Sequence, residues 1–116
     1  MTPADKLTNK ELEAIKLSEE AYTIFYNKFT ELSNERRNEL LQVGLDILID
    51  KLKINEGTAA IIQQLIHFRM ILINLAGKSN SIKKLVNDEI EFIIKIVLKD
   101  AENNRISGNY DEYTNN

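Results

Sequence analysis

Residues 58–77 read TAAIIQQLIHFRMILINLAG, and this stretch decides the fold. A helix drawn through it is apolar on nearly every side, with few polar breaks. Its length and its lack of internal breakers favour a helix over a strand. We predict that this helix begins after a Thr58 cap and ends at Gly77, which can adopt the left-handed conformation of a C-terminal cap. A helix that is apolar almost all round lies either at the centre of a protein or in an interface.

Two helices are predicted on the N-terminal side of this stretch. The quartet Thr8-Asn9-Lys10-Glu11 has the form of a capping box and predicts a first helix over 9–32. Ser33 can cap a second helix over 34–53. In both segments apolar residues recur at threes and fours, so each helix presents one apolar stripe to a core. Gly44 in the second helix costs nearly ~1 kcal/mol of helix propensity relative to Ala, so we expect a neighbouring helix to approach closely there.

One more helix is predicted after the apolar stretch, over 82–103, with its cap supplied by Ser79 to Ser81. From residue 104 onward the sequence has several Asn residues, a glycine and no periodicity. Four helices joined by short loops predict an all-α fold, a four-helix antiparallel bundle with a flexible C-terminal tail. The expected organisation is an N-terminal arm (1–8), a helical bundle domain (9–103) and the flexible tail (104–116).

Composition narrows the class of protein. The 116 residues suit one domain, and 43% hydrophobic residues suit a folded one. The chain has no Cys, which removes disulfides, thiolate metal sites and cysteine nucleophiles. The net charge is −3 and basic residues are scattered among acidic ones, so nucleic acid is not expected as a partner. No signal peptide is visible, and the longest apolar run, 65–77, is shorter than the about 20 residues of a membrane span, so we predict a cytoplasmic protein without a transmembrane segment.

The residue usage also suggests an origin. Ile, Asn and Lys together supply 40 of the 116 residues, and all three have A/T-rich codons. This pattern favours a low-GC Gram-positive bacterium, or one of its phages or plasmids, as the source.

Candidate catalytic and metal-binding residues are few. Gln64 and His67 stand three apart, as ligands do in di-iron bundles, but a Gln replaces the carboxylate and His67 is the sole His. Asp46 and Asp50 lie four apart on one helical face and could hold a metal as part of an enzyme, yet they fall on the predicted solvent edge. The sequence has neither a glycine-flanked nucleophilic Ser nor a Gly-rich phosphate loop. We therefore expect no enzyme, no cofactor and no metal site, and keep a metal-dependent enzyme as the weakest alternative.

Surplus apolar surface is the most informative feature. The 58–77 helix is more hydrophobic than one side of a four-helix core requires, and Phe92 and Ile96 fall outside the main apolar ridge of the last helix. Two Tyr residues in the tail could order on a partner. The residues predicted to bind a partner are His67, Arg69, Met70, Phe92, Ile96, Tyr110 and Tyr113.

The leading hypothesis is a small non-enzymatic protein that binds another protein, as a regulator or inhibitor of a mobile element or of its host. The partner could be a different protein or a second copy in a homodimer. The alternative is a bacteriocin immunity protein that acts at the inner membrane surface with its receptor complex. Both hypotheses rest on the architecture and the surplus apolar surface.

Overall fold

The computed structural model of the protein describes residues 6–28 and 30–107. In this part of the chain all regular secondary structure is helical, which confirms the predicted all-α class. The four helices are α1 (Asn9–Lys28), α2 (Asn34–Leu52), α3 (Glu56–Ala76) and α4 (Asn80–Ser107).

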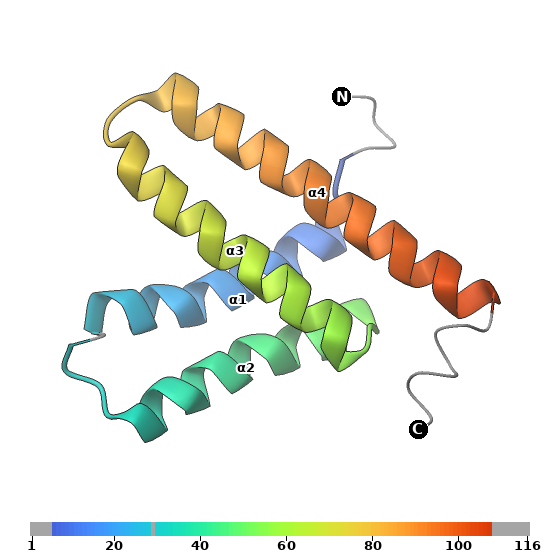
Figure 1. Cartoon of the computed structure of the whole chain (residues 1–116), viewed down its shortest axis with the longest axis horizontal. Coiled ribbons are helices and arrows are strands. Elements are labelled where there is room, and N and C mark those ends of the chain that lie inside the picture. Colours follow the sequence, from blue (N-terminus) through green and yellow to red (C-terminus); the bar gives the residue numbers. More distant parts are fainter. Residues whose placement is uncertain (1–5, 29, 108–116) are drawn as a thin grey trace.

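The helices form two antiparallel hairpins that cross each other (Figure 1). α1 pairs with α2 and α3 pairs with α4, while α3 also packs on both helices of the first hairpin. The molecule measures 43 × 39 × 19 Å, so its short dimension matches two layers of helices packed about 10 Å apart. Each hairpin is therefore covered by the other on one side only.

The predicted capping box is present at the start of α1. The backbone N–H of Thr8 donates to Glu11 Oε1 at 2.7 Å, and the backbone N–H of Glu11 donates to Thr8 Oγ1 at 3.1 Å. Ser33 likewise caps α2, since its Oγ accepts from the backbone N–H of Arg36 at 3.2 Å. These bonds satisfy amide groups that the first turn of a helix leaves unpaired.

Some helix ends differ from the prediction. α1 ends at Lys28, four residues earlier than expected. α3 begins at Glu56 because Asn55 is its cap: the Asn55 Oδ1 accepts from the backbone N–H of Thr58 at 2.7 Å, and Thr58 itself is a buried helical residue. α4 reaches Ser107, so residues 104–107 are helical and do not belong to a tail. No Gly or Pro stands between the predicted end of this helix and Gly108 to stop it.

The core lies where the two hairpins cross. Leu48 of α2, Ile62 and Ile66 of α3 and Ile94 of α4 are completely buried there. α1 contributes a buried row that includes Ala14, Ile15, Ser18 and Tyr22. Every helix thus buries one stripe, as the periodicity predicts.

Gly44 marks a close approach between helices and confirms the prediction for that residue. A Cβ at this position would lie 3.1 Å from Ser18 Oγ on α1 and 3.3 Å from Gln63 Nε2 on α3. Gln63 in turn donates to the backbone oxygen of Leu41 on α2 at 2.7 Å. A glycine is needed here because three helices meet within van der Waals contact.

Candidate functional site

The two sides of α3 differ in what they contact. Ile62, Ile66 and Arg69 are buried on the side that faces the first hairpin. The opposite side carries a row of exposed apolar side chains: Ile61 is 50% exposed, Phe68 53%, Ile71 40% and Leu75 78%. The first hairpin lies on one side of α3 (Figure 1), and the described residues leave this row exposed on the other. α3 therefore packs on all three other helices and is also a surface helix.

α4 adds a second row beside the first. Its buried residues Ile90 and Ile94 face the core, and Ile82, Leu85 and Ile96 are exposed to between 50% and 72%. α3 and α4 are antiparallel neighbours (Figure 1). Both helices turn their buried residues toward the core, so we place their exposed rows on one surface of this hairpin. We call this surface the outer face, and its apolar members are Ile61, Phe68, Ile71, Leu75, Ile82, Leu85, Phe92 and Ile96.

The outer face is large for a monomer of this size. Its exposed apolar side chains present roughly 700 Å² to solvent, taking about 180 Å² for a fully exposed large apolar side chain. The largest apolar patch of a typical monomer is about 300–600 Å² and often has a function. The charged residues next to these rows are on α4, where Asp88, Glu89 and Lys99 are all exposed.

The residues that the sequence predicts to bind a partner do not all lie on one surface in the structure. Ile96 and Phe92 belong to the outer face, Ile96 half-exposed and Phe92 partly buried. Met70 is partly buried on the core side of α3, next to Arg69. Tyr110 and Tyr113 lie outside the described residues. Phe68, Leu75 and Leu85 belong to the outer face but were not predicted. A signal was present, because Ile61, Phe68 and Leu75 recur every seven residues on α3 and Leu85 precedes Phe92 by seven on α4.

His67 packs in an aromatic cluster between α1 and α3. Its ring centroid lies 5.8 Å from that of Tyr22 and 5.2 Å from that of Tyr26, the second pair in an edge-to-face arrangement. Burial raises the pKa of both tyrosines, so their hydroxyls stay protonated at neutral pH. Edge-to-face rings at these distances stabilise the packing of α3 on α1. His67 is thus placed to hold two helices together.

Arg69 is buried and faces away from the outer face. Its guanidinium forms an ion pair with Glu19 of α1. Burial lowers the pKa of Arg69, while the charge of Glu91 on α4 acts in the opposite direction. The three residues line an open cleft of about 450 Å³ where α1, α3 and α4 come together. The arginine therefore connects the hairpins, and the prediction that it contacts a partner remains untested.

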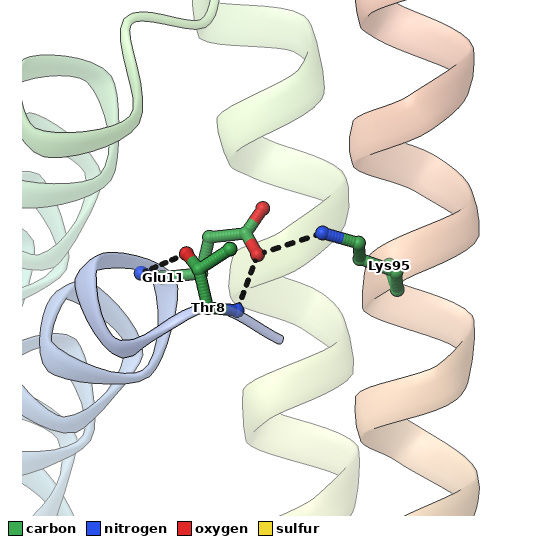
Figure 2. Close-up of polar contacts among 3 residues, drawn as sticks. All are labelled: Thr8, Glu11 and Lys95. Carbon is green, nitrogen blue, oxygen red and sulfur yellow. Dashed lines mark hydrogen bonds and ion pairs between the residues drawn. The ribbon is translucent and has the colours of Figure 1, made fainter. Parts of the chain in front are cut away.

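A second open cleft, of about 550 Å³, lies between the start of α1 and the end of α4. Figure 2 shows its central contact, in which Lys95 Nζ lies 3.0 Å from Glu11 Oε1. Burial alone would raise the pKa of Glu11, but the hydrogen bond from the Thr8 backbone N–H and the ammonium of Lys95 together lower it. The carboxylate is committed to two structural partners and is poorly placed to exchange a proton with a substrate.

The carboxylates considered for a metal site are exposed on α2, and each contacts a different neighbour. Asp46 Oδ1 accepts from Gln42 Nε2 at 2.8 Å, and Asp50 Oδ1 lies 3.7 Å from Lys53 Nζ. Among residues 6–28 and 30–107, no three His, Asp or Glu side chains come together as a metal site would need. Metal-dependent chemistry at these residues has no geometric support in the described part of the chain.

Comparison with known proteins assigns the chain to no family. No protein-family model matches it, and neither the curated proteins nor the solved structures gave a match. One described helix, α3, is long and apolar enough to cross a membrane by length and composition, with 22% of its most apolar window buried in the fold. The outer face is the feature from which a function can be inferred.

Proposed function

We propose that the protein is a non-enzymatic binding protein that docks its outer face onto another protein surface, as a small regulator or inhibitor does. The observation that carries the proposal is the set of exposed apolar side chains on α3 and α4. Removing roughly 700 Å² of apolar surface from water is favourable by about 25 cal/mol per Å² before the costs of association. A host or mobile element of the low-GC Gram-positive kind is part of the same proposal.

The composition of the outer face suits a protein partner. Between Gly57 and Ala76 the sole Asp, Glu, Lys or Arg residue is Arg69, which lies on the core side. The exposed charges Asp88, Glu89 and Lys99 are all on α4, away from the apolar row of α3. An apolar centre with charged residues around it is the usual composition of a protein–protein interface.

The test is site-specific cross-linking in the native host. A photoreactive phenylalanine analogue replaces Phe68, and a matched control carries it at Asn38, an exposed residue of α2 in the other hairpin. We expect discrete protein adducts that depend on light and form from position 68 but not from position 38. The absence of any protein adduct from position 68 would overturn the proposal.

A second candidate, a bacteriocin immunity protein at the membrane surface, is favoured by one observation. α3 has the length and composition of a membrane-crossing helix. This candidate requires the outer face to bind lipid, where an anionic membrane would repel Asp88 and Glu89 and attract Lys99. Co-flotation of the purified chain with phosphatidylglycerol vesicles, lost on changing Phe68 and Leu75 to Ser, would support it, and failure to float would set it aside.

A further inference from the structure

We propose that the outer face is occupied by a second copy of the same chain, with the two α3–α4 hairpins antiparallel. This inference rests on the proposed function and adds to it the identity of a partner and the geometry of the contact. The described part of the chain leaves the outer face uncovered.

The area of the outer face matches the need of a stable dimer. A standard protein interface buries about 800 Å² on each partner, and the apolar part of the outer face alone exposes roughly 700 Å². A two-fold dimer brings the same patch of both subunits together, so apolar surface meets apolar surface. A partner with a charged surface could not match this row, because α3 offers it no opposite charge.

Spacing on α4 gives the register. Ile82, Glu89 and Ile96 recur every seven residues. Leu85, Phe92 and Lys99 form a second series with the same spacing, offset from the first by three residues. This is the pattern of a helix-pairing seam, with Glu89 and Lys99 as its charged members.

An antiparallel pairing of two α4 helices gives each of these two charged residues a partner of opposite charge. The register that sets Phe92 of one copy opposite Ile96 of the other also sets Glu89 opposite Lys99, because both pairs are centred on residue 94. Residue 94 is also close to the middle of α4, so the two helices overlap along their length. Two-fold symmetry makes each contact occur twice.

The opposite arrangement, with both hairpins pointing the same way, is disfavoured by charge. Its two-fold axis runs along the hairpin, so α4 of one copy lies on α3 of the other. Glu89 would then face a row without any charged residue and would be desolvated without a partner. The charge pattern therefore selects the antiparallel dimer.

The first measurement is the mass of the purified full chain by light scattering over a range of concentrations. We expect the mass to rise from 13.4 kDa to twice that value as concentration increases. Changing Phe68 and Phe92 to Ser should leave a monomer with unchanged helical circular dichroism. A wild-type monomer at every concentration would overturn the second-copy proposal.

Charge reversal tests the geometry. Glu89→Lys and Lys99→Glu should each weaken the dimer about ten-fold at low salt, because each replaces two attractive contacts by two repulsive ones. The double variant E89K/K99E, and an equimolar mixture of the two single variants, should dimerise like the wild type. Matched controls with the same charge changes on the first hairpin, Glu20→Lys and Lys51→Glu, should have no effect. A dimer that depends on Phe68 but is insensitive to these reversals would overturn the antiparallel register.

Cross-linking and light scattering together distinguish the second-copy proposal from the proposed function. A cross-link from position 68 to a different protein, together with a monomer in light scattering, would overturn the second-copy proposal and support the proposed function. A cross-linked adduct of twice the chain mass, without an adduct to a different protein, supports the second copy as the occupant and overturns docking of the outer face onto a different protein. The absence of any protein adduct together with a monomer overturns both.

Discussion

Lys95 on α4 donates a hydrogen bond of 3.0 Å from its Nζ to Glu11 Oε1 at the start of α1 (Figure 2). The two residues are 84 positions apart, and the contact joins the last helix to the first turn of the chain. The same carboxylate oxygen accepts the backbone N–H of Thr8, so the helix cap and the tertiary contact depend on one atom.

Replacing Glu11 by Gln should lower the free energy of unfolding by about 1 kcal/mol near neutral pH. The folded-state pKa of Glu11 is lowered, so its stabilising effect is present above the ordinary carboxyl pKa and is lost as the pH falls through the folded-state value. Urea unfolding should therefore show the wild type and the variant converging in acid. Glu13→Gln, on the same helix but exposed, is the control and should change little. A constant difference at all pH values would contradict the assignment.

Replacing Arg69 by Met should cost about 3–5 kcal/mol of stability, because the change leaves the Glu19 carboxylate next to Glu91 without its cation. Changing Glu19 to Gln in the same chain should recover part of the loss. Arg36→Met provides the comparison, since the Arg36–Glu39 pair is more than half exposed and should contribute less than about 1 kcal/mol. Chemical denaturation of the wild type and the three variants measures their free energies of unfolding. Equal losses of stability for Arg69→Met and Arg36→Met would contradict the prediction.

Replacing Gly44 by Ala should destabilise the fold by about 1 kcal/mol, although Ala is the better helix former. The new methyl group would press on Ser18 Oγ and Gln63 Nε2, and the hydrogen bond of Gln63 to Leu41 limits its retreat. Gly57→Ala is the matched control: its methyl group would meet Asn55 Oδ1 at an ordinary 3.5 Å, so this variant should be as stable as the wild type or more so. Thermal melting of both variants and the wild type measures these differences in stability.

Replacing Leu75 and Leu85 by Gln should change the stability of the monomer by no more than about 0.5 kcal/mol each, because these side chains are 78% and 72% exposed. Ile62→Ala on the buried side of α3 should cost about 2–5 kcal/mol. Denaturation at a concentration low enough to disfavour association separates the two effects. A large loss from the Gln variants would mean that the outer face is part of the core.

Much of the local structure could be predicted from the sequence. The capping box at Thr8 and the Ser33 cap place the starts of α1 and α2 correctly, because capping bonds involve residues only three positions apart. The cap of α3 was misassigned to Thr58, since Asn55 is an equally good acceptor three residues earlier. The excess of apolar residues in α3 and α4 was also visible in the sequence.

The sequence by itself determined that this chain forms helices and that it has more apolar side chains than one small core can bury. Only the tertiary structure decided which of them remain exposed. Periodicity shows that a helix has an apolar side, but the crossing of the two hairpins determines which sides are covered (Figure 1). This crossing buries Arg69 against Glu19 and leaves Phe68, its neighbour in sequence, half-exposed. The reason is physical: such contacts join residues far apart in the chain, and no local pattern records them.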